Sequence, residues 1–325
     1  MTRLVRPDEH DDPVAAVLSA HRSGARLALA TSGTTGPGPR RVVRTTTSWW
    51  DSFPAYSELT GVGEGARVWV PGPLGSTMNL FAAVHAAWAG ADLVDDPASA
   101  DHACLTPAVL ERRGEGLPRG ARVVVAGAHL PARLRATSRQ HGLRLTHYYG
   151  AAELSFVAAA ANEGDGAALR AFAGVEIEIR DDPVPGTIWS RSPWVCIGYA
   201  GPPGSLLRAA EGWATVGDVG SLESGVLVVH GRPDAIVTAG ATVLIADVES
   251  VLAPAARGAV AVHAVPHPTL GALVAATLTL DADREPLERI ARDRLPVTHR
   301  PRVWRVVPHL PLTDSGKVDR AALDR

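Results

Sequence analysis

The stretch RLALATSGTTGPGPRR, from Arg26 to Arg41, decides the fold of this protein. Its first five residues are a short apolar run of strand length, and the residues that follow are rich in threonine, glycine and proline. The sequence thus predicts a strand that leads directly into a polar loop. Such a loop can surround a phosphate with hydroxyl and backbone donors, although the same composition is common in ordinary surface loops. No Gly-Lys-Ser/Thr sequence closes it, so typical P-loop NTPase chemistry is not expected.

Strand-like and helix-like segments alternate around this stretch. A capped helix is predicted from Pro13 to about Ser23, because an aspartate pair precedes a proline and an apolar run. Further strands are predicted at 68–70, 93–94 and 122–125, with helices at 78–89 and 107–113. This alternation predicts an α/β fold.

The pattern changes after Tyr149, where short alternating strands at 175–179, 186–189 and 225–229 are separated by glycine and proline. They predict an added antiparallel region. A βαβ-like pattern resumes at Asp234, with strands at 243–245, 259–265 and 273–280 and helices at 247–252 and 286–295. We therefore expect a large domain over 1–233 and a small C-terminal α/β domain over 234–325, although the loop at 201–204 is a competing boundary.

Composition narrows the class of protein. The 325 residues are 46% hydrophobic and 20% charged, with a formal net charge of −2, which is typical of a soluble globular protein. This balance disfavours nucleic acid and anionic membranes as partners. The chain has 2 cysteines and no long apolar run, so we expect a reducing, cytoplasmic location without a membrane span.

Lysine usage singles out one side chain. Lys317 is the only lysine among the 32 basic residues, and all the others are arginine. A coding bias toward arginine would explain the asymmetry, and one lysine can escape such a bias by chance. A compact ammonium on a flexible stem can, however, follow a moving charge that a planar guanidinium cannot follow. Lys317 is therefore a candidate functional residue.

Five groups of short motifs occur in order along the chain. They are TSGTTG at 31–36, AGA at 126–128, HYYGAAE at 147–153, GW at 212–213 with GDVG at 217–220 and GRPD at 231–234, and LPLTDSGKVDR at 310–320. With this set, the chain resembles the adenylate-forming superfamily of acyl-CoA synthetases, adenylation domains and luciferases. The resemblance extends from residue 26 to the C-terminus, and the common order of the motifs makes it specific.

The resemblance implies a nucleotide site. The implied ATP-binding residues are Thr31, Ser32, Gly33, Thr34, Thr35, Gly36, Gly127, Ala128, Tyr149, Gly150, Ala151, Asp218 and Arg232. Tyr149 would lie against adenine, and Asp218 would accept hydrogen bonds from the ribose. Glu153 is the implied catalytic and magnesium-binding carboxylate, with Thr34 as a second metal ligand. Without this context, Tyr149 is equally a core tyrosine and Asp218 a turn residue.

The resemblance also implies a mobile C-terminal lid domain. Lys317 would be catalytic, contacting the α-phosphate of ATP and the attacking carboxylate while charge builds on phosphorus. Asp234 would be the hinge between the domains. Gly240 would line the channel through which a thiol reaches the acyl group.

Several positions depart from the family pattern. The phosphate loop has an extra residue and carries Arg40 in place of the usual lysine, whereas Ala152 and Val216 each replace a hydroxyl residue. Ser76 stands where many acyl-CoA synthetases have a histidine. Only 30 residues precede Thr31, so we expect most of the first N-terminal subdomain to be missing, as in short relatives that resemble o-succinylbenzoate-CoA ligases.

We therefore predict an AMP-forming acid–thiol ligase that uses ATP and Mg²⁺ to adenylate a small-molecule carboxylic acid and then forms a thioester with coenzyme A. One alternative is an acyl-AMP ligase that loads the phosphopantetheine of a carrier protein. Another is a degenerate relative that binds nucleotide or acyl ligand without turnover. The missing subdomain would expose apolar surface, which is compatible with a homodimer.

The acyl pocket is expected near 76–81 and after Glu153. Four aromatic residues either line it or fill the core, namely Trp49, Trp50, Phe53 and Phe156. The sequence does not identify the acid.

Overall fold

Two compact units make up the chain in a computed structural model of the protein. The structure describes residues 3–31, 40–127, 130–160, 168–181, 185–201, 203–232, 235–311 and 318–324. Unit 1 comprises Met1–Thr31 and Arg40–Gly231, and unit 2 includes Arg232–Arg325.

The first sheet of unit 1 combines N-terminal strands with one strand from much later in the chain. Its order is β1 (Leu4–Val5), β2 (Arg26–Ala30), β3 (Arg41–Thr45) and β13 (Gly198–Ala200). Strands β2 and β3 form an antiparallel hairpin, and β13 pairs antiparallel with β3. As predicted, helix α1 spans Pro13–Arg22, and the carboxylate of Asp12 accepts a hydrogen bond from the N–H of Ala15 (2.9 Å) at its start.

The largest sheet of unit 1 has seven strands in the described part of the chain. Its order is β10 (Arg170–Ala171), β9 (Ser155–Ala160), β8 (Arg144–Ala151), β7 (Arg122–Val125), β6 (His102–Leu105), β4 (Arg67–Trp69) and β5 (Asp92–Val94). The strands from β8 to β5 pair in parallel, whereas β9 and β10 pair antiparallel. The helices of this unit besides α1 are α2 (Thr47–Trp50), α3 (Phe53–Thr60), α4 (Thr77–Trp88), α5 (Pro107–Arg113) and α6 (Ala132–Gln140). The predicted α/β class is confirmed.

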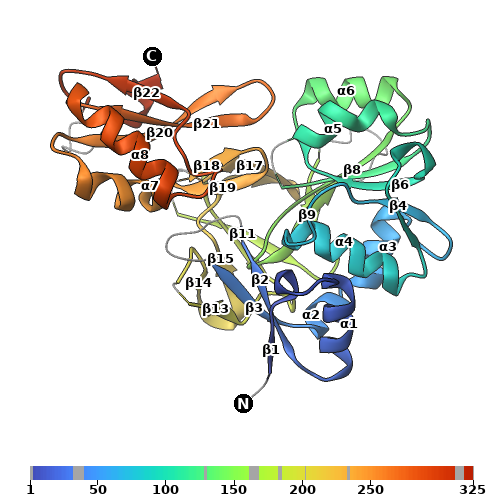
Figure 1. The fold of residues 1–325 in the computed structure, drawn as a ribbon. Coiled ribbons are helices and arrows are strands. Elements are labelled where there is room, and N and C mark those ends of the chain that lie inside the picture. The colour runs from blue at the N-terminus through green and yellow to red at the C-terminus, as the bar shows by residue number, and fades with distance from the viewer. Residues whose placement is uncertain are drawn as a thin grey trace. The chain divides into compact units, whose positions relative to one another are not determined.

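Both faces of the seven-stranded sheet are covered, as is usual for parallel sheets. Figure 1 shows α3 and α4 on one face and α5 and α6 on the other. The side chains of Cys104 and Val124 join the core beneath α4, whereas Leu105, Val123 and Val125 join the core beneath α5 and α6. Successive strand residues thus point to opposite faces, which explains the nearly continuous apolar runs in β6 and β7.

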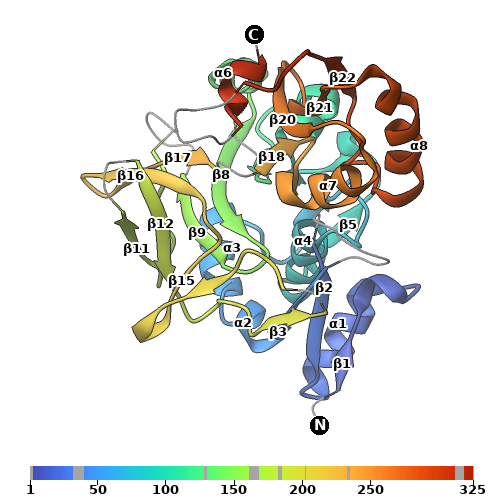
Figure 2. The same cartoon turned by 90° about the vertical axis from the view of Figure 1, so that its left-hand side faces the viewer.

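The antiparallel region predicted after Tyr149 forms the third sheet of unit 1 (Figure 2). Its order is β14 (Leu207–Arg208), β15 (Trp213–Thr215), β12 (Gly186–Arg191), β16 (Val219–Glu223) and β17 (Val226–Gly231), and β11 (Glu176–Arg180) also pairs with β12. All of these pairings are antiparallel. The prediction for this region is confirmed.

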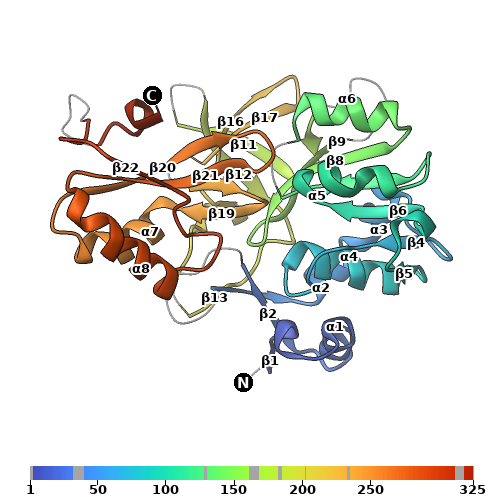
Figure 3. The same cartoon turned by 45° about the horizontal axis from the view of Figure 1, so that its top comes forward.

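Unit 2 is a smaller sheet with two helices on one face (Figure 3). The strand order is β19 (Ala241–Leu244), β18 (Ala235–Thr238), β21 (Gly271–Leu278) and β20 (Val260–His267), and β22 (Val303–Val306) pairs with β21. Helices α7 (Ile245–Leu252) and α8 (Arg284–Arg294) pack their apolar residues against these strands.

The βαβ-like pattern expected for unit 2 is wrong for its central strands. Strands β20 and β21 form an antiparallel hairpin, because residues 268–270 alone separate them and a parallel connection needs a dozen or more residues. Within the described part of unit 2, the parallel pairing is that of β21 with β22. No helix among the described residues is both long enough and apolar enough to cross a membrane.

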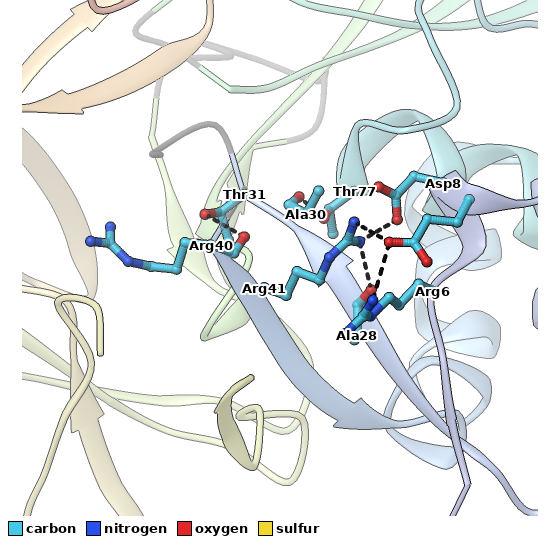
Figure 4. Close-up of polar contacts among 9 residues, drawn as sticks. Arg6, Asp8, Ala28, Ala30, Thr31, Arg40, Arg41 and Thr77 are labelled. Atoms are coloured by element: carbon cyan, nitrogen blue, oxygen red, sulfur yellow. Dashed lines mark hydrogen bonds and ion pairs between the residues drawn. The ribbon is translucent and has the colours of Figure 1, made fainter. Parts of the chain in front are cut away.

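Arg41 anchors the start of β3 to the N-terminal segment (Figure 4). Its guanidinium forms ion pairs with Asp8 and Glu9, the second at 3.0 Å between Nη2 and Oε1. The Arg41 side chain is 9% exposed, and the hydrogen bond with Asp8 raises the pKa of Arg41 above its ordinary value, against the effect of burial. Arg40 points to the opposite side of the strand, as alternation along β3 requires.

His85 is a titratable side chain in the core of unit 1. It lies on α4, is 1% exposed, and its Nε2 is 2.8 Å from the hydroxyl of Ser57. Burial lowers the pKa of His85 to about 4, because the charged imidazolium loses its hydration in the core. The folded protein therefore keeps this histidine neutral.

Replacing Arg41 should destabilise unit 1. Arg41→Gln leaves Asp8 without its buried partner, so the free energy of unfolding should fall by about 3 kcal/mol. Urea denaturation followed by tryptophan fluorescence measures this loss, because seven of the 8 tryptophans lie in unit 1. The matched control is Arg67→Gln, which removes an exposed ion pair with Asp101 and should cost less than about 1 kcal/mol. Equal losses in the two variants would contradict this role for Arg41.

Acidification should weaken the fold through His85. The unfolded chain takes up a proton at about pH 6.5, whereas folded His85 takes it up only near pH 4. The free energy of unfolding should therefore fall as the pH drops through this window, by up to about 3 kcal/mol, and His85 should contribute no pH dependence above about pH 7. His85→Gln does not titrate, so urea denaturation should show a shallower loss for this variant. Identical pH profiles for the two proteins would contradict the prediction.

Candidate active site

The β2–β3 hairpin holds together the two ends of the predicted phosphate loop. Thr31 donates both its N–H (2.9 Å) and its hydroxyl (3.2 Å) to the carbonyl of Arg40. The hydroxyl of Thr77, the first residue of α4, donates to the carbonyl of Ala30 (3.0 Å) and so fixes the end of β2. The other predicted loop residues lie outside the described part of the chain, namely Ser32, Gly33, Thr34, Thr35 and Gly36.

Two of the residues predicted to contact adenine come to one edge of the seven-stranded sheet. Gly127 follows the end of β7, and Tyr149 lies near the end of β8. The two strands pair in parallel as far as Val125 and His147, so Gly127 and Tyr149 both lie beyond the paired region at its carboxyl edge. Ligands of open α/β sheets commonly bind at this edge. Ala128 lies outside the described residues.

A hydrogen bond joins Tyr149 to Asp218. The tyrosine hydroxyl donates to Oδ2 of the carboxylate at 2.8 Å, across 69 residues of sequence. Asp218 lies between β15 and β16, and its carbonyl accepts a hydrogen bond from the N–H of Ile188 on β12 (2.8 Å). The structure thus brings together two predicted nucleotide-binding residues and fixes the backbone of one of them.

The residues before Asp218 explain one departure from the family pattern. The hydroxyl of Thr215 donates to the carbonyl of Ile188 (2.6 Å) and accepts from the N–H of Gly217 (3.0 Å). Val216 is 2% exposed and packs in an apolar cluster with Leu154. A hydroxyl at position 216 would be desolvated among these side chains, so an apolar residue suits this place.

Glu153 lies in the turn between β8 and β9. The strands pair Ala151 with Ser155, and their register shifts at Gly150. A Cβ at Gly150 would lie 2.1 Å from the carbonyl oxygen of Ser155, so glycine alone allows this approach of the two strands. The N–H of Leu154 donates to the carbonyl of Ala151 (3.1 Å) and closes the turn. A defined hairpin therefore carries Glu153.

Two residues that contact this turn were not among the predicted site residues. Tyr199 on β13 donates its hydroxyl to Oε1 of Glu153 (2.9 Å), and Arg44 on β3 donates from Nη2 to the carbonyl of Ala152 (2.6 Å). Arg44 is 1% exposed. Burial lowers the pKa of Arg44 to about 10, and Cys196 and Glu153 oppose that shift. No local pattern marks either residue, because the pairing of distant strands brings them to the turn.

Three of the four aromatic residues expected near the acyl pocket belong to the core. Trp49, Phe53 and Phe156 are each at most 3% exposed and lie in one hydrophobic cluster. Trp50 is half-buried and stacks on His21 with ring centroids 3.8 Å apart. Of the two interpretations of these side chains, the structure favours the core for Trp49, Phe53 and Phe156.

Unit 2 carries the remaining predicted residues. Arg232 lies at its start, where its carbonyl accepts a hydrogen bond from the N–H of Ala235 (3.1 Å). Gly240 lies in the two-residue turn between β18 and β19, a type of connection that matches the twist of a hairpin. Asp234 and Lys317 lie outside the described residues, so their hinge and catalytic roles stay predictions.

Comparisons with known proteins agree with the predicted family. The AMP-binding enzyme C-terminal domain matches residues 247–317. The uncharacterized acyl–CoA ligase YhfT of Bacillus subtilis (strain 168) is 30% identical over 329 residues, which cover 91% of this chain and 67% of that protein. A probable 2-succinylbenzoate–CoA ligase of Mycobacterium tuberculosis (strain ATCC 25618 / H37Rv) is 35% identical over 221 residues, which cover 62% of this chain and 53% of that protein.

A solved structure shares the fold. The amide bond synthetase McbA from Marinactinospora thermotolerans matches with a TM-score of 0.73 and 26% identity, over 92% of this chain and 68% of that chain. The chain thus spans between about half and two thirds of the length of these three proteins. From its matches in sequence and fold, the chain belongs to the adenylate-forming superfamily that includes the acyl-CoA ligases.

Proposed function

We propose that this protein is an AMP-forming acid–thiol ligase, which adenylates a small carboxylic acid with ATP and transfers the acyl group to coenzyme A. The hydrogen bond between Tyr149 and Asp218 carries the proposal, because it joins two nucleotide-binding candidates at the carboxyl edge of the seven-stranded sheet. Similarity to acyl–CoA ligases supports the reaction class.

The first half-reaction would form the acyl-adenylate. A carboxylate oxygen of the acid attacks the α-phosphorus of ATP, and the bond from that phosphorus to the departing pyrophosphate breaks. Tyr149 would stack on adenine while Asp218 accepts hydrogen bonds from the ribose. Lys317 would place its positive charge between the α-phosphate and the attacking carboxylate, where negative charge accumulates in the transition state.

The donor set at Glu153 fits a magnesium ion held between protein and phosphate. Oε1 of Glu153 accepts a hydrogen bond from Tyr199, whereas Oε2 accepts none from the described residues. A carboxylate oxygen is a hard ligand, and Mg²⁺ usually binds one or two protein carboxylates besides substrate phosphates. A bound ion would neutralise charge on the phosphates, with Thr34 as its second proposed protein ligand. Among the residues with a described placement, no three acidic, histidine or cysteine side chains form a metal-binding group.

The second half-reaction would form the thioester. The sulfur of coenzyme A attacks the acyl carbonyl carbon, AMP departs, and the thiol proton passes to solvent. We propose that unit 2 turns about Asp234 between the two half-reactions, which withdraws Lys317 and presents the β18–β19 turn with Gly240 to the thiol. The proposed lid is unit 2 itself.

Loss of the Lys317 charge should abolish most of the activity. Lys317→Ala should lower carboxylate-dependent pyrophosphate release at least about a hundredfold, because a positioned charge contributes a factor of that order. Arg292→Ala removes an exposed charge from α8 and is the matched control, whose rate should stay unchanged. An unchanged rate in Lys317→Ala would contradict the mechanism.

The pyrophosphate-release assay, run with different acids and then with different thiol acceptors, tests which substrates the protein uses. Aryl, short-chain and long-chain acids should be compared first, followed by coenzyme A and a phosphopantetheinylated carrier protein as separate acceptors. We expect acylated coenzyme A with at least one class of acid. Acylation of the carrier protein alone would show a carrier-loading ligase instead. ATP binding with no acid-dependent pyrophosphate release would show a non-catalytic relative.

A further inference from the structure

The hydroxyl of Tyr199 lies between two partners that together fix its direction. It donates to Oε1 of Glu153 (2.9 Å) and accepts from the backbone N–H of Leu206 (3.0 Å). A phenol has one proton, and a backbone N–H can only donate. The proton of Tyr199 is therefore committed to the carboxylate of Glu153.

The hydrogen bond from Tyr199 to Glu153 has a carboxylate as its acceptor. A hydrogen bond to a charged group is stronger than one between neutral groups.

The surrounding chain is shaped to hold the tyrosine ring. A Cβ at Gly204 would lie 2.5 Å from Cζ and from the hydroxyl oxygen of Tyr199, so any larger residue at this position would displace the ring. Strand β13 also pairs with β3, with Tyr199 opposite Val42. Both the backbone and the ring of Tyr199 are therefore fixed by their neighbours.

The backbone of the Glu153 turn is held from two further directions. Arg44 donates from Nη2 to the carbonyl of Ala152 (2.6 Å), and the N–H of Cys196 donates to the carbonyl of Glu153 (2.8 Å). Arg44 itself donates from Nη1 to the hydroxyl of Ser48 (3.3 Å). The turn thus cannot shift relative to β3 without breaking buried hydrogen bonds, which are costly to leave unmade.

These contacts restrain the carboxylate of Glu153. The backbone of the turn is held and Oε1 is engaged by Tyr199, whereas Oε2 accepts no hydrogen bond from the described residues. Hydrogen-bond partners of a metal-binding side chain orient that side chain, and removing such a partner typically weakens metal binding ten- to a hundredfold.

We propose that Tyr199 is a positioning residue that orients the carboxylate of Glu153 toward magnesium, on a turn whose backbone Arg44 and Cys196 hold in place. This proposal rests on the proposed function, because it assigns Glu153 to the magnesium of MgATP. Tyr199 acts through Glu153 and does not itself contact the nucleotide.

Calorimetric titration of ATP into the full chain at graded magnesium concentrations tests the proposal. For each protein, the titrations give the magnesium concentration at which half of the maximal gain in ATP affinity is reached. This concentration should be about tenfold higher for Tyr199→Phe than for the wild type. ATP affinity without magnesium should match that of the wild type, as should the thermal unfolding midpoint within a few degrees. Excess magnesium should restore pyrophosphate release in Tyr199→Phe.

Three control variants separate a positioning role from a general structural one. Thr187→Val removes another hydroxyl-to-carboxylate hydrogen bond of unit 1, that to Asp181 (2.6 Å), and should leave the magnesium dependence unchanged. Glu153→Gln should lose the magnesium response, and the double variant Tyr199→Phe/Glu153→Gln should bind like Glu153→Gln alone.

The possible results distinguish the two proposals. If the wild type binds ATP with a magnesium response that Tyr199→Phe retains in full, the positioning role is wrong while the proposed function stands. The positioning role is equally wrong if Tyr199→Phe weakens binding by the same factor in the Glu153→Gln background as in the wild type. If wild-type ATP binding does not respond to magnesium, both proposals are wrong.

Discussion

The hydrogen bond between Tyr149 and Asp218 connects two parts of unit 1 that have different architectures. Tyr149 lies near the end of β8 in the mixed seven-stranded sheet, whereas Asp218 lies in a turn of the antiparallel sheet. The carboxylate of Asp218 can accept the hydrogen bond from the hydroxyl of Tyr149 only if the two sheets meet at a fixed separation. The core cluster around Leu154 and Val216 supplies that fixed separation, since Tyr149 packs against it and Val216 lies two residues before Asp218. The nucleotide site proposed above depends on this junction.

Strand β3 is the second organising element of the site. It begins directly after Arg40, where the predicted phosphate loop ends, and its successive side chains point to opposite sides of the sheet. Arg41 contacts the N-terminal acidic pair, and Arg44 contacts the Glu153 turn. Its other edge pairs with β13, which carries Tyr199. One short strand thus links the loop proposed to bind phosphate with the carboxylate proposed to bind magnesium.

Local patterns were enough to predict several elements of the fold. The aspartate and proline before α1 predicted its start, and α5 occupies the predicted range 107–113. Strand β3 was not predicted, because RVVRT lacks a clear apolar alternation and forms a strand through its pairing with β2 and β13. The central hairpin of unit 2 was mistaken for part of a βαβ unit, since periodicity reveals strands but not their partners.

Residues of the candidate site could be proposed from the sequence only where a motif marked them. The motifs pointed to Tyr149, Glu153 and Asp218, but no sequence signal connects Tyr199 with a glutamate 46 residues earlier. Arg44 is one arginine among thirty-one, and nothing in its sequence context marks it, although it is 1% exposed in the folded protein. Long-range pairing made these contacts, so the folded chain was needed to find them.

The close approach at Gly150 has a consequence for how this protein can change. Any side chain at this position would collide with the carbonyl oxygen of Ser155, which belongs to the backbone and has no rotamer to move aside. Position 150 therefore accommodates glycine alone. Changes to the proposed nucleotide site must therefore come through neighbouring side chains, while the backbone at this position stays constant.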